Sequence, residues 1–553
     1  MALWRHDDAS LRWPAWSEAP DGDAVASYAS VPVDWRRLVD EPDPSRAALA
    51  LARELAARPE RLAELSPPLL AGIREPAAGR LTILGDFAGA GRLYEMRFDG
   101  GGSGPGVTGT VWSNRLGALP IFAGTAPRAD RDSWLLFAAA GWFISDATPV
   151  AGAHKVPPGV AIRVTVNPGD PAAGARIELA DAGALGALVA PRDEPLDRAV
   201  DRAAADAVGL CMGIEAAYEA PPRIDLSGGR DSRVSAAAAV AAGIPCFVRT
   251  GDNVPGELEI AERLVAAAPI ELEHNVTRGE SGQPEDELAD RVRAIHLVHD
   301  GMRNPQELRR PMNLPLGAKP RRPTMSGHGG EIAHGFYYTS ARKLREIRDG
   351  GDAGLVDRMD RAARRKAPAA RKEAYARHRE EIELILDAGR AHGLAGPVLL
   401  DWFYLVHRLA YRSGLGARSN RFSACATPGF VRASFDLTPE ERLEAKLHNA
   451  LIPRLVPEWA PIEFLNTKAK ADLPEITRDY IWDKPGHAEH VDDVVRAGGA
   501  WEEAFDRRRV RKMWKQARRG KGHRHFETIF NRVVWRQAFE EHLRTLARAA
   551  GAT

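Results

Sequence analysis

The first 190 residues alternate short apolar runs with turn residues, which predicts mainly β-strands. One early segment differs, because Ala and Leu recur every three or four residues from Pro44 to Leu65 and predict a helix. The later apolar runs are bounded by Gly, Pro, Asn or Asp and predict strands: LTILGDF, RLYEMRF, GTVWSN, LPIFAG and AIRVTV. Segments 99–106 and 167–175 are rich in Gly and predict connecting loops.

The pattern changes near Asp193. From there the chain becomes rich in Ala and charged residues with helical spacing, interrupted by a few short apolar strands. Such alternation is typical of an α/β domain. A chain of 553 residues exceeds the size of one ordinary domain. We therefore expect two domains, covering residues 1–190 and 191–553.

The charge balance, the cysteines and the apolar stretches limit the classes of protein to which the chain can belong. The chain has 76 basic and 75 acidic residues, so its net charge argues neither for nor against a nucleic-acid partner. Its three cysteines form no C-x-x-C pair, which suits a reducing compartment and argues against a structural zinc site. The first residues, MALWRHDDASLRWPAW, lack the basic-then-apolar pattern of a signal peptide, and no stretch approaches eighteen apolar residues free of charge. We expect a soluble cytoplasmic protein that binds neither membrane nor nucleic acid.

One stretch, Arg507 to His525, is basic and contains no acid. It is either a solvated helix face with its following loop, or a contact for an anionic ligand such as a nucleotide tail or an acidic peptide. Nucleic-acid binding through this stretch would require affinity that falls steeply with salt.

The segment IDLSGGRDSR, Ile224 to Arg233, carries the clearest chemistry. An apolar strand leads into a Ser-Gly-Gly turn, and RVSAAAAVAAG then predicts a helix that ends at Gly243. Two glycines let the backbone approach a phosphate, which the helix N-terminus and the flanking hydroxyls favour. Asp231 would repel that phosphate unless a cation such as Mg²⁺ lies between them. The Walker A spacing is absent, so the segment predicts a different loop for a metal-bound polyphosphate.

The pattern S-G-G-x-D-S resembles that of the ATP pyrophosphatases, which cleave ATP between its α and β phosphates. Further segments in the same order narrow the resemblance to the asparagine synthetase family: PCFVRTGD, NVPGELEIAERLVAAAPIELEHNV, MSGHGGEIAHGFYY and DWFYLVHRLAYRSG with the helical FSACATPGFV region. The resemblance implies an ATP-pyrophosphatase (PP-loop) synthetase domain with a parallel sheet and a helical C-terminal part.

The same resemblance implies the site residues. ATP would be bound by Leu226, Ser227, Gly228, Gly229, Arg230, Asp231, Ser232, Thr250, Gly251 and Gly327. Asp231 and Glu331 would bind Mg²⁺, although His328 stands where the family usually has an acid.

Other residues are candidates with less defined roles. A catalytic lysine of the family would correspond to Lys468 or Lys470. Arg230 and Arg233 flank the loop and either reach phosphate or, for Arg233, face solvent. Candidate pocket residues without a defined role are His299, Asp300, Tyr337 and Tyr338.

Residues 80–165 resemble a degenerate form of the family's N-terminal-nucleophile (Ntn) glutaminase sandwich, through LGDFAGAGRLYEM, VWSNRLGALPIF and WFISDATPVAGAHKVPPGV. Glutamine-hydrolysing members use a cysteine directly after the initiator methionine. This chain begins Met1-Ala2 and its first cysteine is Cys211, so we expect a front domain without glutaminase activity.

Relatives without that cysteine include β-lactam synthetases and lasso peptide cyclases. The resemblance therefore implies an ATP- and Mg²⁺-dependent ligase that adenylates a carboxylate for attack by an amine, on a small molecule or peptide that carries both groups. The alternatives are an ammonia-dependent amidotransferase acting on an amino acid or sugar acid, and a nucleotide-binding scaffold without catalysis. The oligomeric state is left open.

Overall fold

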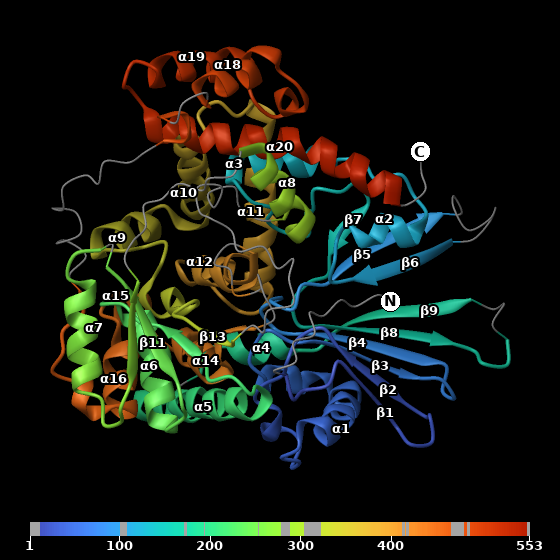
Figure 1. The fold of residues 1–553 in the computed structure, drawn as a ribbon, viewed down its shortest axis with the longest axis vertical. Helices are drawn as coiled ribbons and strands as arrows, with labels where there is room; N and C mark the ends of the chain where they lie inside the picture. The colour runs from blue at the N-terminus through green and yellow to red at the C-terminus, as the bar shows by residue number, and fades with distance from the viewer. Residues whose placement is uncertain are drawn as a thin grey trace.

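A computed structural model gives the arrangement of the chain (Figure 1). It describes residues 11–99, 108–170, 174–192, 194–252, 254–277, 288–302, 322–411, 415, 420–465, 480–483 and 487–549. These residues form a mixed α/β protein, with antiparallel sheets in the N-terminal region and a parallel sheet with helices after it.

The front region contains two antiparallel sheets. The larger has the order β1-β2-β3-β4-β8-β9 and the smaller the order β6-β5-β7. The strands are β1 (Trp16–Glu18), β2 (Val25–Tyr28), β3 (Leu70–Glu75), β4 (Arg80–Gly85), β5 (Tyr94–Asp99), β6 (Thr108–Ser113), β7 (Ala153–Lys155), β8 (Val160–Val166) and β9 (Ala175–Asp181). A small apolar cluster joins Ile83 and Ile162 of the larger sheet to Trp112 of the smaller one, so the two sheets pack face to face.

The helices of the front region are α1 (Pro44–Ala57), α2 (Ala118–Ala123), α3 (Arg131–Ala140) and α4 (Ala184–Val189). The helix predicted from Pro44 is confirmed as α1. Its first residue is a proline, and the Asp43 side chain accepts hydrogen bonds from the N–H groups of Ser45 and Arg46.

The strand predicted for LPIFAG is wrong, because this segment forms helix α2. Leu119, Pro120 and Ala123 are buried, whereas Phe122 is exposed, a spacing that fits a helix face and not the alternation of a strand. Gly124 ends the helix in a left-handed conformation with φ 62°. A short apolar run alone does not distinguish the two structures.

The second region is built on a five-stranded parallel sheet of order β12-β11-β10-β13-β14. Its strands are β10 (Arg223–Asp225), β11 (Phe247–Gly251), β12 (Glu273–Thr277), β13 (Thr324–Met325) and β14 (Arg421–Phe422). From β10 the chain adds β11 and β12 on one side and later β13 and β14 on the other. The direction of winding therefore reverses between β10 and β13, which is where open parallel sheets bind ligands.

Many helices surround this sheet. They are α5 (Leu196–Ala217), α6 (Arg230–Ala242), α7 (Glu257–Ala266), α8 (Leu288–His299), α9 (Ala341–Asp349), α10 (Gly351–Lys366), α11 (Lys372–Ala391), α12 (Val398–Phe403), a π-helical turn (Tyr404–Arg408), α13 (Leu409–Tyr411), α14 (Pro428–Asp436), α15 (Pro439–Leu443), α16 (Lys446–Leu455), α18 (His487–Ala497), α19 (Arg507–Ala517) and α20 (His523–Ala549). The helix predicted to end at Gly243 is confirmed as α6.

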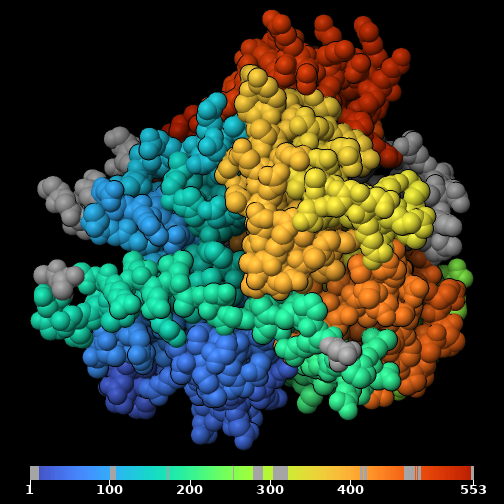
Figure 2. Space-filling view, turned by 180° about the vertical axis from the view of Figure 1, so that it is seen from behind, coloured from blue at the N-terminus to red at the C-terminus, as the bar shows by residue number. Residues whose placement is uncertain are grey.

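The two regions share one apolar core. Helix α11 packs on α3, and the long helix α20 returns to the front region, where Arg532 donates to the carbonyl oxygens of Ala138 and Ala139. Seen from behind, the yellow and light-orange helices lie against the teal front region and below the red C-terminal helices (Figure 2). No helix among the described residues is long and apolar enough to cross a membrane.

Candidate functional site

The Ser-Gly-Gly turn lies at the carboxyl end of β10, where the sheet changes its direction of winding. Ser227 Oγ and Ser232 Oγ lie 2.9 Å apart, and the Ser227 N–H donates to Ser232 Oγ. The Gly229 N–H donates to Ser227 Oγ, and α6 begins at the next residue. The two hydroxyls thus shape the turn from inside and direct it into the helix N-terminus, which favours an anion.

A second glycine-rich loop follows β13 and packs against the first turn of α6. A Cβ on Gly327 would come within 2.5 Å of the Asp231 carbonyl carbon, and one on Gly330 within 2.4 Å of Asp231 Cγ. Ser235 Oγ on α6 donates to the Ser326 carbonyl oxygen at 2.7 Å. The two loops singled out in the sequence therefore meet, and only glycine permits their closest approach.

Asp231 faces two histidines. His334 Nε2 lies 3.3 Å from Asp231 Oδ2, and Nε2 of the fully buried His448 lies 2.9 Å from Oδ1, the latter outside hydrogen-bonding angles. Burial alone would raise the pKa of the Asp231 carboxyl, but these two rings outweigh burial and keep the pKa well below its ordinary value.

The two histidines respond differently to that carboxylate. Burial opposes protonation of His334, yet the contact with Asp231 raises its pKa above the ordinary value. For His448, burial dominates and lowers the pKa. Of the two rings, His334 is therefore the one whose protonated form the Asp231 carboxylate favours.

Glu331 begins the next turn of the same loop. Its Oε2 accepts a hydrogen bond from the hydroxyl of Tyr404, which belongs to the π-helical turn. Burial is the main reason why the pKa of the Cys425 thiol is raised, and the negative charges of Asp231 and Glu331 raise it further. Both carboxylates therefore lie near this thiol. The Cys425 thiol donates to the Asp231 carbonyl oxygen at 3.5 Å.

The donor set is consistent with magnesium delivered by a phosphate ligand. In the described part of the chain, no group of three or more His, Cys, Asp or Glu side chains is arranged to bind a metal ion. Magnesium is commonly bound by one or two carboxylates together with substrate phosphates, and does not require a cage made of protein alone. Asp231 and Glu331 fit that requirement as two oxygen donors on opposing loops.

Two further residues predicted to bind ATP lie on the neighbouring strand. Thr250 and Gly251 end β11, and Thr250 Oγ1 lies 3.0 Å from His274 Nε2. Leu226 donates its N–H to the Arg249 carbonyl oxygen. Since parallel strands end at one edge of a sheet, the residues predicted for nucleotide binding after β10, β11 and β13 share that edge.

The two flanking arginines differ. The Arg230 guanidinium lies 5.6 Å from the centre of the Phe464 ring. Arg233 neither faces solvent nor is free for phosphate, because it is buried and donates to the carbonyl oxygens of Ile462 and Glu463. It binds segment 462–465, in which the Leu465 N–H donates to the Gly228 carbonyl oxygen. Lys468 and Lys470 lie outside the described residues.

Other sequence candidates are dispersed. Tyr337 lines a cavity next to Phe336, whereas Tyr338 is buried and donates to Asp401. Asp300 pairs with Arg115 of the front region, and His299 is in the last turn of α8. Helix α19 buries Val510, Trp514 and Ala517 and carries basic side chains on its exposed positions, as a solvated helix face does.

Sequence reasoning missed three residues of the site: His334, Tyr404 and His448. His334 follows Glu331 at a spacing of one short helical turn, which is a signal that could have been used. Tyr404 and His448 come from distant helices, and nothing in their local sequence marks them. Comparison with known proteins supplies no relative, since no family model and no curated protein sequence matches the chain.

Proposed function

We propose that the protein is an ATP-dependent ligase that adenylates a substrate carboxylate, with release of pyrophosphate, and joins the acyl group to an amine with release of AMP. The observation that carries this proposal is the meeting of two glycine-rich loops, with Asp231 between them, at the winding reversal of the parallel sheet. The resemblance of both loops to those of the asparagine synthetase family indicates which bond is cleaved, namely the one between the α and β phosphates of ATP.

The roles of the chain's own residues follow from their positions. The Ser227–Ser232 turn and the N-terminus of α6 bind the phosphates through backbone N–H groups. Asp231 and Glu331 would bind Mg²⁺, which neutralises pyrophosphate as it leaves. Arg233 positions the segment up to Leu465 against Gly228 and so closes one side of the turn.

His334 contributes through its position beside Asp231. Its Nε2 lies 3.3 Å from Asp231 Oδ2, and the carboxylate raises the pKa of the ring against the effect of burial. The contact helps to hold the Asp231 carboxylate in place between the two loops.

The experiment uses ATP labelled at the α-phosphate with Mg²⁺ and pools of carboxylic acids, amines and peptides. We expect AMP and pyrophosphate with at least one pool, and a loss of about 100-fold or more in Asp231→Asn. Asp201→Asn is the matched control, because Asp201 is an exposed carboxylate on α5 that pairs with Arg454.

Each result has a defined meaning. ADP in place of AMP would refute the mechanism. Consumption of ammonium together with AMP formation would favour an ammonia-dependent amidotransferase, whereas labelled ATP that binds and is never cleaved would favour a nucleotide-binding scaffold.

A further inference from the structure

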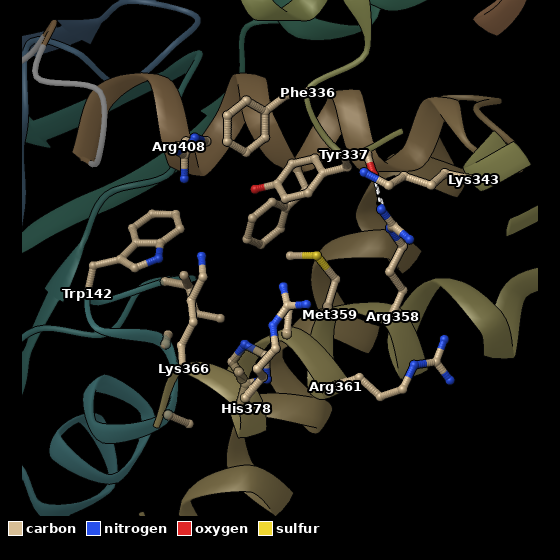
Figure 3. Close-up of a pocket in the computed structure, with 17 residues that line it drawn as sticks. Trp142, Phe336, Tyr337, Lys343, Arg358, Met359, Arg361, Lys366, His378 and Arg408 are labelled. Carbon is tan, nitrogen blue, oxygen red and sulfur yellow. Dashed lines mark hydrogen bonds between the residues drawn. The ribbon is translucent and has the colours of Figure 1, made fainter. Parts of the chain in front are cut away.

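A separate cavity of about 570 Å³ lies between the end of α3 and the helices α9 to α12 (Figure 3). Among the described residues that line it, none is Asp or Glu and six are cationic: Lys343, Arg358, Arg361, Arg365, Lys366 and Arg408. Its volume is that of a pocket for a small organic molecule. In Figure 3, Arg408 and Lys366 extend toward each other from opposite walls.

The cations at this cavity differ from their neighbours on the same helices. Arg364 pairs with Asp360, and Arg379 pairs with Asp357. By contrast, Arg361, Arg365 and Arg408 make no ion pair with any described residue. Carboxylates thus pair with Arg364 and Arg379, whereas these three arginines at the cavity make no ion pair with a described residue.

The charges at the cavity also repel one another. Arg358 donates to the Tyr337 carbonyl oxygen, and its pKa is lowered by burial and then by Arg361 and Arg365, with Glu346 opposing. His378, which is buried in the wall, adds no positive charge, because burial lowers its pKa to about 4. An anionic ligand would relieve this repulsion.

The rest of the wall is aromatic and apolar. Trp142, Phe336, Tyr337 and Phe403 line the cavity with Met359, and the Arg408 guanidinium lies 4.0 Å from the centre of the Phe336 ring. Flat apolar walls beside arginines suit a ligand with a planar or apolar body and negative groups at its edges.

The cavity lies near the candidate site. Phe336, which lines the cavity, lies 5.5 Å from the Tyr404 ring between centroids, and the Tyr404 hydroxyl donates to Glu331. Two rings, Phe336 and Tyr404, therefore link the wall of the basic cavity to the carboxylate expected to bind Mg²⁺.

We propose that this cavity binds an organic polyanion with an aromatic or apolar body and two or more carboxylates, as a free acid or as an acidic peptide. This inference rests on the proposed function: the polyanion is the substrate whose carboxylate is adenylated. One carboxylate is the group that is adenylated, and the others are bound by the cations of the wall.

The test measures binding without ATP, by calorimetry, with trimesate as the aromatic tricarboxylate and its neutral triamide as the control ligand. We expect trimesate to bind and the triamide not to bind. A blocked Glu-Phe-Glu peptide and its Gln-Phe-Gln counterpart distinguish an acidic peptide from a free acid. Equal binding of charged and neutral ligands, or no binding by either charged ligand, would overturn the proposal.

Three variants locate the binding. Arg408→Gln and the exposed pair Arg365→Gln/Lys366→Gln should each weaken trimesate binding by about tenfold or more. Arg508→Gln/Lys512→Gln on α19 removes the same charge as the double variant from exposed positions outside the cavity and should change binding less than about twofold. A larger loss from the α19 variant than from the cavity variants would place the ligand on the basic stretch and refute the cavity.

Failure of the two proposals can be told apart. If trimesate binds through Arg408 while no acidic compound supports AMP formation, the cavity is retained and the ligase proposal fails. If AMP forms only with acids that bind equally well to the Arg408 and Arg365/Lys366 variants, the ligase is retained and the cavity is not its substrate site. Displacement of trimesate by ATP in strict competition would identify the cavity as a nucleotide site and overturn the assignment.

Discussion

The charged side chains at the winding reversal of the parallel sheet and those at the basic cavity differ in whether they have partners within the protein. At the reversal, Asp231 is already matched by His334 and His448, and Glu331 by the Tyr404 hydroxyl. At the cavity, Arg361, Arg365 and Arg408 have no carboxylate partner among the described residues. The carboxylates at the reversal are thus held by contacts within the protein, whereas these three arginines at the cavity have no such ion pair.

The difference bears on how each site binds. Internal contacts fix the position of a functional group before the ligand arrives, which lowers the cost of organising the site during reaction. Unpaired like charges raise the energy of the empty pocket, and an anion removes that cost when it binds. We therefore expect the reversal to set the reaction rate and the cavity to set substrate affinity, and each prediction below separates these quantities.

The largest effect is expected from Gly330→Ala. The added Cβ would lie 2.4 Å from Asp231 Cγ and Oδ1, so the carboxylate must move away from its present position. We expect AMP formation to fall by about 100-fold or more while trimesate affinity stays within about twofold. Single-turnover assays with labelled ATP and calorimetry with trimesate measure the two quantities.

Gly209→Ala is the matched control for that substitution. Gly209 lies in α5, and a Cβ there would meet no atom within 4 Å. The change should leave AMP formation intact and stabilise the fold by about 0.4–1 kcal/mol. If Gly330→Ala kept full activity, the close packing of the second loop on Asp231 would have no catalytic importance.

A smaller effect is expected from Tyr404→Phe, because the ring remains and only the hydrogen bond to Glu331 is lost. Removing a hydrogen bond to a carboxylate costs about 1.5–3 kcal/mol, so AMP formation should fall about tenfold or more. The ring contact with Phe336 is unchanged, so trimesate affinity should be unchanged.

Tyr28→Phe provides the comparison for Tyr404→Phe. Its hydroxyl donates to the Ala48 carbonyl oxygen in the front region, apart from both sites, so the variant should lose stability and keep activity. Equal losses of AMP formation in the two variants would mean that Tyr404 acts through stability alone.

The contrast between the sites also explains what the sequence can predict. The Ser-Gly-Gly turn is contiguous, and its chemistry depends on glycine and hydroxyl types that are visible in one dimension. The second loop was located through the resemblance of its segment to one in the asparagine synthetase family, and the structure brings Gly330 against Asp231. By contrast, Trp142, Arg358 and Arg408 come from separate helices and loops, and only tertiary packing brings them to one cavity.

Two other differences between the sequence predictions and the structure also have physical causes. LPIFAG was predicted as a strand because apolar runs of this length suit both structures, and a buried helix face decided the matter. Arg233 could not be placed from sequence, because its partners are carbonyl oxygens of a segment far along the chain.

The smallest effect concerns Lys155 in the front region, whose surroundings differ from those of the charged groups at both sites. This lysine is buried, and its Nζ donates to the carbonyl oxygens of Phe143 and Ser145, which flank the cavity residue Ile144. It also lies 4.2 Å from the centre of the Tyr411 ring. Neutral carbonyls and a ring, not a ligand, thus surround this cation.

The pH dependence of stability should reveal Lys155. Burial lowers its pKa from 10.5 to about 7, with Arg92 acting in the same direction and Asp146 and Glu381 opposing. Between these two values the unfolded chain binds a proton that the folded chain lacks, so this group makes stability rise with pH across that window. Below pH 7 both states are protonated and its contribution no longer changes.

Lys155→Met should remove this component. Urea unfolding across the window should give a slope of stability against pH that is lower than in the unsubstituted protein by up to about 1.4 kcal/mol per pH unit. Lys372→Met, at an exposed lysine on α11, should keep the original slope. Unchanged slopes in both variants would show that Lys155 stays protonated when folded, and that carbonyl groups and an aromatic ring alone stabilise a buried cation beside this cavity.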